Sequence, residues 1–240
     1  MMRTGSSAAG DRLVRMRSLL SQINILRGCT SAELGELGGS AEIVRYSPGE
    51  LITEQSALPA AVCLVAFGHV RLTSFGDNGR ELILTNVEPG GFFEEESLRG
   101  AAIRGASAIA LDEATVVWIR AEAFASFLHE HPRVALSFAM QLSRQLHRAY
   151  DSVAGLGLLS VEERLIRTLE RLAEEQGSRR SHDGLLLQAR PTHLELAARV
   201  GACRETVTRA FKSLTRRGLV VPQGDGLLLS CAGPQRAKPH

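Results

Sequence analysis

The chain has 240 residues, of which 44% are hydrophobic and 22% charged, and its formal net charge is +2. This composition is typical of soluble globular proteins, and the length allows one large or two modest domains, each with its own core. The first residues lack the apolar core of a signal peptide, and no stretch approaches the roughly 18 uninterrupted apolar residues of a membrane helix, so we expect a cytoplasmic protein without membrane contact.

The N-terminal region is predicted to be helical after a short tail. Residues 1–10 are small and polar, which is typical of a disordered tail. A helical pattern follows from Arg12 to about Leu37. Thr30 and Glu33 have the spacing of a capping box, which predicts the start of a short second helix.

Short β-strands dominate the next part of the chain. From Ala41 to Arg120 the hydrophobic pattern has the period of strands, and six runs stand between turn sequences such as SPGE, GDNG and EPGG. The runs are AEIVRYS, LIT, AVCLVAF, HVRLTSF, ELILTNV and ATVVWIR. Many short strands between glycine turns indicate a closed or rolled β unit.

A long helix is predicted after Pro132, which ends a short helix over AEAFASFLHEHP. The apolar residues of the long helix have the repeat of a helix that packs along a partner helix; they are Ala139, Leu142, Leu146, Ala149, Val153 and Leu156. We interpret this stripe as the seam of a homodimer. A helix that lies on its own domain is the alternative.

Further helices and a hairpin are predicted in the C-terminal part. Ser160 and Glu163 form a capping-box pair that begins one helix, and Thr192 and Glu195 form another that begins the helix HLELAARV. A second short helix, CRETVTRAFKSL, follows Gly201, which is the arrangement of a helix-turn-helix. The runs LVVP and LLLS, separated by QGDG, then predict a β-hairpin, the wing of a winged helix.

The segment CRETVTRAFKSL divides into two faces when it is placed on a helix. The apolar arc holds Val207, Ala210, Phe211 and Leu214, and the polar arc holds Arg204, Glu205, Thr208, Arg209 and Lys212. Residues 160–240 also carry 14 Lys/Arg against 9 Asp/Glu, whereas residues 1–159 carry 14 against 17. A basic region with a polar helix face indicates an anionic partner. The alternative is a solvated surface helix with ion pairs such as Glu205–Arg209.

Recognition of DNA explains the residue types on the polar face. Arginine can donate two hydrogen bonds to guanine and glutamate can accept one from cytosine, so Arg204 and Glu205, at the start of the helix, are candidate base readers. Thr206, Thr208 and Lys212 are suited to phosphate contacts, which position a protein without reading sequence.

The sequence THLELAARVGACRETVTRAFKSLTRRGLV resembles the DNA-binding motif of the CRP/FNR family of bacterial transcription regulators, whose core reads G-C-S-R-E-T-V-x-R. The resemblance extends from about Leu19 to Ser230. It implies an α+β fold with four parts: a disordered tail and lead-in helix (1–18), a cyclic-nucleotide-binding-type β-roll, or jelly roll, as sensor domain (19–132), a dimerisation helix (133–159) and a winged helix-turn-helix (160–240).

By the same resemblance the protein would be a DNA-binding regulator and not an enzyme. Arg204, Glu205 and Arg209 would read bases and Thr206 would contact phosphate, in a homodimer on a palindromic TGTGA-like site of double-stranded DNA. RNA polymerase would be a further partner. A ligand-binding module that acts on another protein is the alternative, but it would leave the winged helix without a role.

The resemblance also defines a candidate effector pocket. Cyclic-nucleotide-binding members of the family bind the ribose with a glutamate in a G-E-L turn, and the phosphate with an arginine that is followed by Ser or Thr. Glu95 and Arg104 match these two groups. Glu94 stands in place of the glycine, however, and Gly105 stands in place of the Ser or Thr.

The long helix departs from the family pattern as well. It has Ala149 and Tyr150 where cAMP-binding members use Thr or Ser to read adenine across the dimer. Because Glu94 adds bulk and charge where the backbone approaches the ligand, and Gly105 offers no side-chain donor, we expect the effector to be another ligand, a redox signal or none. A cAMP response through the two matching groups is the alternative.

Other sensing groups are not indicated by the sequence. An iron–sulfur cluster needs a group of cysteine thiolates, and Cys29 is the one cysteine near the N-terminus. A haem would have Cys63, His69 and His147 as lone candidates for an axial ligand. A metal enzyme on the β unit would need paired histidines, and residues 41–120 contain one. We therefore expect no cofactor and no bound metal.

Cys203 stands where the family commonly has serine. A thiol at a helix N-terminus beside Arg204 can have a lowered pKa and be oxidisable, and an oxidised sulfur there would crowd DNA. We interpret Cys203 as a small residue that fills the helix cap, with a redox role as the alternative.

Overall fold

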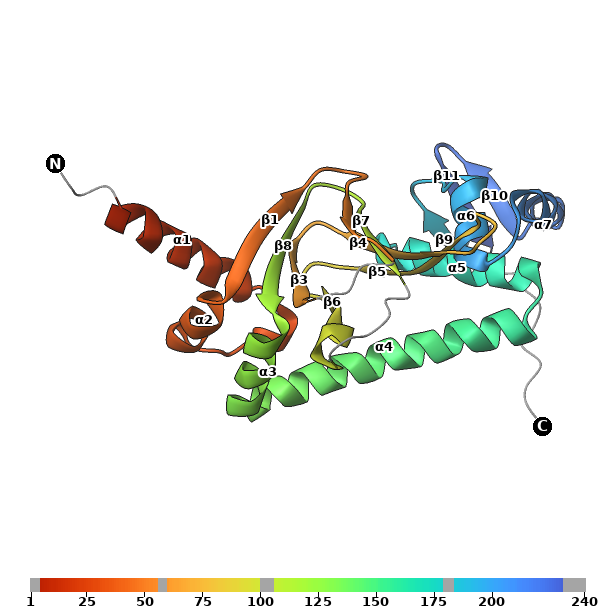
Figure 1. Ribbon diagram of the computed structural model, residues 1–240. Coiled ribbons are helices and arrows are strands. Elements are labelled where there is room, and N and C mark those ends of the chain that lie inside the picture. Colours follow the sequence, from red (N-terminus) through yellow and green to blue (C-terminus); the bar gives the residue numbers. More distant parts are fainter. Residues whose placement is uncertain (1–4, 56–59, 100–105, 179–183, 231–240) are drawn as a thin grey trace. The chain divides into compact units, whose positions relative to one another are not determined.

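The computed structural model describes residues 5–55, 60–99, 106–178 and 184–230, with side chains from residue 12 onward (Figure 1). The chain forms two compact units, Met1–His147 and Arg148–His240, which are called the first and the second unit below. The long helix α4 (Pro132–Leu158) contains the boundary between them. No described helix is both long enough and apolar enough to cross a membrane.

The first unit begins with helix α1 (Gly5–Leu20), the short 3-10 helix η1 (Asn24–Leu26) and helix α2 (Ser31–Gly38). The capping box predicted for α2 is confirmed, because Glu33 N donates to Thr30 Oγ1 at 3.3 Å and Thr30 N donates to Glu33 Oε2 at 2.5 Å. Helix α1 begins at Gly5, whereas the sequence predicts a disordered tail through residue 10. The alanines of the segment SSAAGD favour a helix, and this preference outweighs the small size and polarity on which the prediction rested.

Two four-stranded antiparallel sheets form the β-roll of the first unit (Figure 1). One sheet has the order β1 (Ala41–Tyr46), β8 (Ala114–Arg120), β3 (Ala61–Phe67) and β6 (Phe92–Phe93). The other has the order β2 (Leu51–Thr53), β7 (Ser107–Ala110), β4 (Val70–Phe75) and β5 (Glu81–Val87). All six predicted strands are present. Strands β6 and β7 were not predicted, because a two-residue run and the small-residue run SAIA carry little strand pattern.

Strand β3 is buried along most of its length because both of its faces are covered. Val62 and Leu64 belong to the apolar cluster between one sheet and the helices, to which helix α3 (Ala121–Glu130) contributes. Cys63 and Val65 belong to the cluster between the two sheets. Strand β6 pairs with β3 at Leu64 and Cys63. The segment that follows β6, which contains the candidate effector residues, therefore starts from a fixed point in this core.

The second unit contains helices α5 (Val161–Glu175), α6 (His193–Val200) and α7 (Arg204–Arg216). Its antiparallel sheet has the order β10 (Val220–Gln223), β11 (Gly226–Ser230) and β9 (Gly184–Leu187). The predicted wing is confirmed as the hairpin of β10 and β11. Strand β9 was not predicted, because the run GLLL lacks the alternation of a half-buried strand and its partner, β11, lies far along the chain.

Ser160 caps helix α5 with the capping box that the sequence predicts. Glu163 N donates to Ser160 Oγ at 3.3 Å, and Ser160 N donates to Glu163 Oε2 at 2.8 Å. The box fixes the start of α5, whose Leu165 and Leu169 lie in the core of the second unit.

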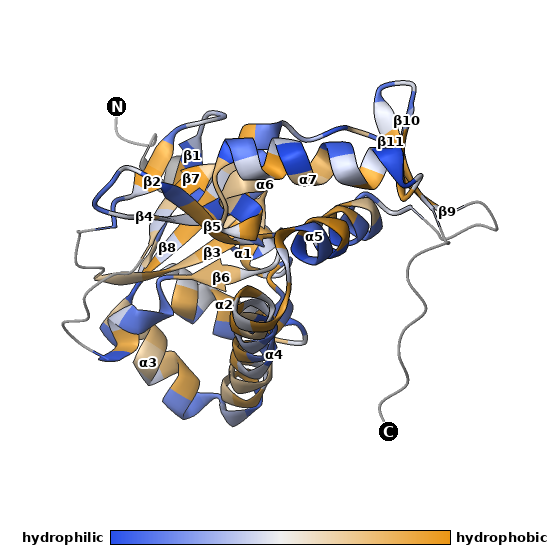
Figure 2. Ribbon diagram, turned by 90° about the vertical axis from the view of Figure 1, so that its right-hand side faces the viewer, coloured by the Kyte–Doolittle hydropathy of each residue, from blue (hydrophilic) through white to orange (hydrophobic). Residues whose placement is uncertain are grey.

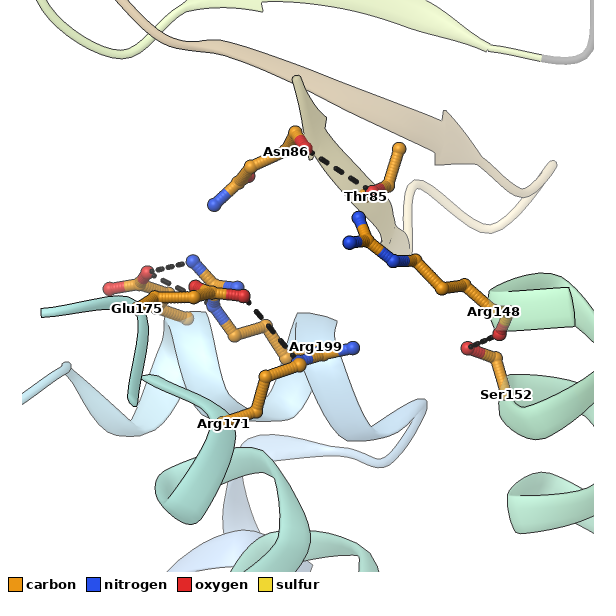
Figure 3. Close-up of polar contacts among 8 residues, drawn as sticks. Thr85, Asn86, Arg148, Ser152, Arg171, Glu175 and Arg199 are labelled. Carbon is orange, nitrogen blue, oxygen red and sulfur yellow. Dashed lines mark hydrogen bonds and ion pairs between the residues drawn. The ribbon is translucent and has the colours of Figure 1, made fainter. Parts of the chain in front are cut away.

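We predict that Ser160→Ala lowers the free energy of unfolding of the second unit by about 1 kcal/mol, because the Glu163 N–H group in the first turn of α5 loses its acceptor. Urea denaturation followed by circular dichroism measures the change. The matched control is Ser152→Ala within α4, where Ser152 Oγ donates back to Arg148 O at 3.0 Å (Figure 3) and alanine is the better helix former. Equal losses of stability in the two variants would contradict the capping role.

Candidate nucleic-acid interface and effector segment

Helix α7 has the two faces that the sequence predicts (Figure 2). The buried face consists of Val207, Ala210, Phe211 and Leu214, which pack in the core of the second unit. On the opposite face Arg204, Glu205, Arg209 and Lys212 are exposed, while Thr206 and Thr208 are half-buried. Burial of the apolar face therefore directs the charged side chains of α7 outward.

The turn between α6 and α7 sets the angle of a helix-turn-helix. Gly201 caps α6 with φ +62°, and Ala202 N donates to Ala197 O at 3.1 Å. At the other end of α6, Glu195 N donates to Thr192 Oγ1 at 3.1 Å, which is one of the two bonds of the predicted capping box. The Glu195 carboxylate also accepts from Arg199 Nη2 at 3.0 Å. These bonds fix both ends of α6 before α7 begins.

Arg164 of α5 bonds to the ends of two other helices and was not predicted from the sequence. Its Nε donates to Val200 O, at the end of α6, at 2.9 Å. Its Nη1 donates to Leu159 O, just after α4, at 2.9 Å. One guanidinium on α5 therefore satisfies carbonyl groups at the ends of two other helices. On the exposed side of α5, Arg171 Nε lies 3.8 Å from Glu175 Oε1, a pair within one helix that adds little to the fold (Figure 3).

Thr206 joins the side chains at the start of α7. Its Oγ1 lies 3.0 Å from Cys203 Sγ and accepts from Arg209 Nη2 at 3.2 Å. Within the described chain Arg209 forms no ion pair with Glu205, so the pairing considered for these two residues is not found. Arg209 reaches back to Thr206 instead, because a threonine three residues earlier lies on the same side of the helix.

Thr208 is held from inside the unit by His193, a residue that the sequence analysis missed. Thr208 Oγ1 donates to Arg204 O at 2.9 Å and lies 2.9 Å from His193 Nδ1. The His193 ring lies 5.1 Å from the ring of Phe211. Burial, with the charges of Arg190 and Arg204, lowers the pKa of His193, which keeps its imidazole neutral at pH 7. The Thr208 hydroxyl is thus engaged within the protein in this conformation.

The effector segment begins with an unusual backbone at Glu94. Its φ of +66° lies in the left-handed region that favours glycine, the residue that stands here in the family pattern. The side chain is buried, and Glu94 Oε1 accepts from Thr53 Oγ1 at 2.9 Å. Burial raises the pKa of the neighbouring Glu95 to about 7, and the charges of Glu96 and Glu94 act in the same direction. Arg104 and Gly105, the other predicted pocket residues, lie outside the described residues.

Helix α4 exposes an apolar stripe along its length. Of the predicted seam residues, Ala139, Leu146, Ala149, Val153 and Leu156 are exposed. Leu142 is partly buried against the core of the first unit, so it contributes to the fold of that unit. The exposed apolar side chains also include those of Leu136, Met140 and Tyr150. The exposed stripe is thus rotated slightly from the predicted one.

The lone candidates for a sensing group do not converge on one site. Cys63 is buried between the two sheets. His69, between β3 and β4, has its Nδ1 2.6 Å from Oδ2 of Asp112, which lies between β7 and β8. Cys29 is partly buried, and burial raises the pKa of its thiol. His147 is exposed on α4.

Comparison with known proteins agrees with this architecture in both units. Residues 43–131 match the cyclic nucleotide-binding domain, and residues 163–230 match the Crp-like helix-turn-helix domain. The CRP-like cAMP-activated global transcriptional regulator of Mycobacterium tuberculosis is 26% identical over 215 residues, which cover 90% of this chain and 96% of that protein. The cyclic AMP receptor protein of Thermus thermophilus is 36% identical over 177 residues, which cover 73% and 77%.

Solved structures show the same fold. A CRP/FNR-family transcriptional regulator from Thermus thermophilus matches with a TM-score of 0.64 at 29% identity, over 78% of this chain and 93% of that chain. The c-di-GMP responsive global regulator of Xanthomonas campestris matches with a TM-score of 0.72 at 24% identity, over 84% and 99%.

A β-roll, a long helix and a winged helix whose second helix presents charged residues outward define the class of DNA-binding transcription regulators, which are not enzymes. Within this class, the chain belongs to the CRP/FNR family.

The hydrogen bond from Thr206 predicts how the Cys203 thiol titrates. The side-chain and backbone bonds with Thr206 lower the pKa of Cys203, so more of the reactive thiolate is present at a given pH. We expect Cys203 to react with iodoacetamide faster than Cys29 at pH 7.5. In Thr206→Val the pH midpoint of the Cys203 reaction should rise, whereas Thr215→Val, on the same helix, should leave it unchanged. Peptide mass spectrometry over a pH series measures these rates, and an unchanged midpoint in Thr206→Val would contradict the assignment.

Proposed function

We propose that the protein binds a palindromic TGTGA-like site as a homodimer, with helix α7 of each protomer in the major groove. The observation that carries this proposal is the orientation of α7: its apolar face is buried, so Arg204 and Glu205 at its start, and Arg209 further along, point away from the core. The N-terminal residues of a recognition helix are those that meet base edges.

The polar side chains on the outer face of α7 have distinct roles in this proposal. Arg204 contacts guanine O6 and N7, and Glu205 accepts from cytosine N4. Arg209, which is held beside Thr206 at 3.2 Å, is a third reader. Lys212 contacts phosphate, and Thr206 does so when its hydroxyl turns from the protein to DNA. Thr208 contacts phosphate when its hydroxyl leaves its bonds to Arg204 O and His193.

Arg204→Ala should weaken binding to the palindrome by about 1–3 kcal/mol and relax the preference at one base pair of each half-site, because a bidentate contact is lost. Lys212→Ala is the comparison: loss of a phosphate contact should weaken binding to all sequences about equally. Fluorescence anisotropy with single-base variants of the site measures both effects. An unchanged base preference in Arg204→Ala would refute the reading role.

The exposed apolar stripe of α4 is the proposed dimer seam. Leu146, Tyr150 and Val153 are 52%, 63% and 67% exposed. Such a stripe on one helix is removed from water when two copies of the helix pack side by side. A palindromic site then follows from the two-fold symmetry of the dimer, since each protomer presents one α7.

Leu146→Glu should produce monomers in analytical ultracentrifugation and weaken binding to the palindrome by about 100-fold or more, because the second α7 no longer binds in the same complex. The control is Arg148→Glu, which adds a carboxylate on the other side of the helix. Leu142 is unsuitable for this test because it packs in the first unit. A dimer that persists in Leu146→Glu would refute the seam.

The effector segment favours an effector other than cAMP. A cyclic phosphate would meet three successive carboxylates, Glu94 to Glu96, of which Glu94 is buried with Thr53 as its partner. The similar protein of Mycobacterium tuberculosis is named as cAMP-activated, and that of Xanthomonas campestris as c-di-GMP responsive. An anionic nucleotide is therefore the class of ligand for which these proteins use the fold. A cAMP response through Glu95 and Arg104 is the second candidate, because these two residues match the family pattern.

Two further assignments belong to this proposal. RNA polymerase is the expected protein partner, by analogy with transcription activators of the family. Cys203, exposed at the start of α7 with a lowered pKa, is a candidate redox input at the DNA interface.

A further inference from the structure

A histidine and two glutamates meet at the junction of helices α2 and α3, apart from the residues assigned to DNA or effector. Glu36 lies on α2, Glu130 is the last residue of α3, and His131 follows it directly. One ligand atom of each residue lies within 4.8 Å of those of the other two. His131 Nε2 lies 3.8 Å from Glu36 Oε2. Neither the β-roll match nor the winged-helix role gives these residues a function.

The imidazole of His131 is held in an orientation suited to a metal. Its side chain is 18% exposed, and its Nε2 atom is buried without a hydrogen-bond partner among the described residues. Its Nδ1 lies 3.4 Å from Glu33 Oε1. A carboxylate at Nδ1 favours the tautomer whose proton is on Nδ1, which leaves the Nε2 lone pair available to a metal ion on the side where Glu36 Oε2 lies 3.8 Å away. Carboxylate–histidine–metal arrangements use this geometry.

Glu33 is itself fixed by the start of α2. Its Oε2 accepts from Thr30 N in the capping box, which holds the carboxylate in place beside His131. Glu33, fixed by this bond, therefore positions the His131 ring through its contact with Nδ1. The chain of contacts runs from the Thr30 backbone through Glu33 to His131.

Charge and space at the junction suit a cation. Three carboxylates, those of Glu33, Glu36 and Glu130, surround one imidazole, and the nearby guanidinium of Arg133 offsets one charge while it donates to Gly28 O at 3.2 Å. Beside the cluster is a hollow of about 180 Å³ that Glu36 and Glu130 line. It offers room for water molecules that would complete a coordination shell.

We propose that Glu36, Glu130 and His131 bind a divalent first-row transition metal ion, for which Zn²⁺ is the probe, and that Glu33 positions His131. Bonds of about 2.0–2.2 Å to nitrogen and oxygen place neighbouring ligand atoms somewhat over 3 Å apart. The exposed side chains of Glu36 and Glu130 can close this distance by rotation. The bound ion would join α2 to the point at which α4 begins, at Pro132.

Isothermal titration of metal-free, untagged full-length protein with Zn²⁺ tests the proposal. We expect one ion per chain, and a rise in the thermal unfolding midpoint when Zn²⁺ is added. Glu36→Gln and Glu130→Gln should each weaken Zn²⁺ binding at least tenfold, and Glu33→Gln by about 10–100-fold, the range for a residue that orients a metal ligand. The ring of His131 packs against that of Phe127, with 4.2 Å between the ring centroids, so its substitution would disturb packing and the exposed glutamates are the primary variants.

Two controls separate this cluster from other Zn²⁺ ligands. His129→Asn removes an exposed histidine at the end of the same helix, and Cys203→Ser removes the exposed thiol. Both should keep wild-type Zn²⁺ affinity. The proposal is overturned if the wild-type protein binds no Zn²⁺, or if Glu36→Gln and Glu130→Gln bind it as tightly as the wild type.

Discussion

Burial of one face of helix α7 is the constraint on which the account of function depends. Val207, Phe211 and Leu214 must leave water together, and they can do so only if the opposite side of the helix faces outward. The charged side chains of Arg204, Glu205 and Arg209 are thereby held on one exposed face of the helix with a fixed spacing. The capping bonds of α6 and the Arg164 guanidinium then set the position of α7 within its unit.

In the first unit, the backbone at Glu94 links fold and regulation. A left-handed conformation costs a residue with a side chain roughly 1–2 kcal/mol, so the turn is retained here against the preference of glutamate. The buried bond to Thr53 offsets part of this cost. The backbone at this position thus keeps a conformation that suits glycine, the family residue, but it carries a buried carboxylate where glycine would leave the backbone open to a ligand. This difference is the physical reason to expect a changed effector.

Local patterns made most of the fold predictable. The alternating runs identified six strands, the S/T-x-x-E spacings identified helix starts, and the faces of α7 followed from its period; family matches confirm the fold class. Features that depend on distant residues were missed. The hydrogen bond between His193 and Thr208 joins helix α6 to helix α7, and strand β9 is defined by its pairing with β11. Leu142 fits a dimer seam by its spacing, but it packs against the core of the first unit. The Glu36–Glu130–His131 cluster has no sequence signature, because the β-roll separates Glu36 from the other two residues along the chain.

Fluorescence anisotropy of the full-length protein on a labelled TGTGA-type palindrome, at fixed salt and with and without cAMP, tests the central claim most directly. A scrambled duplex of the same composition measures non-specific binding, which the phosphate backbone supplies to any basic surface. The account predicts tight binding to the palindrome, much weaker binding to the scrambled duplex, and no change on addition of cAMP. Equal affinity for the two duplexes would contradict the reading role of α7, and binding that requires cAMP would show that Glu95 and Arg104 suffice despite Glu94.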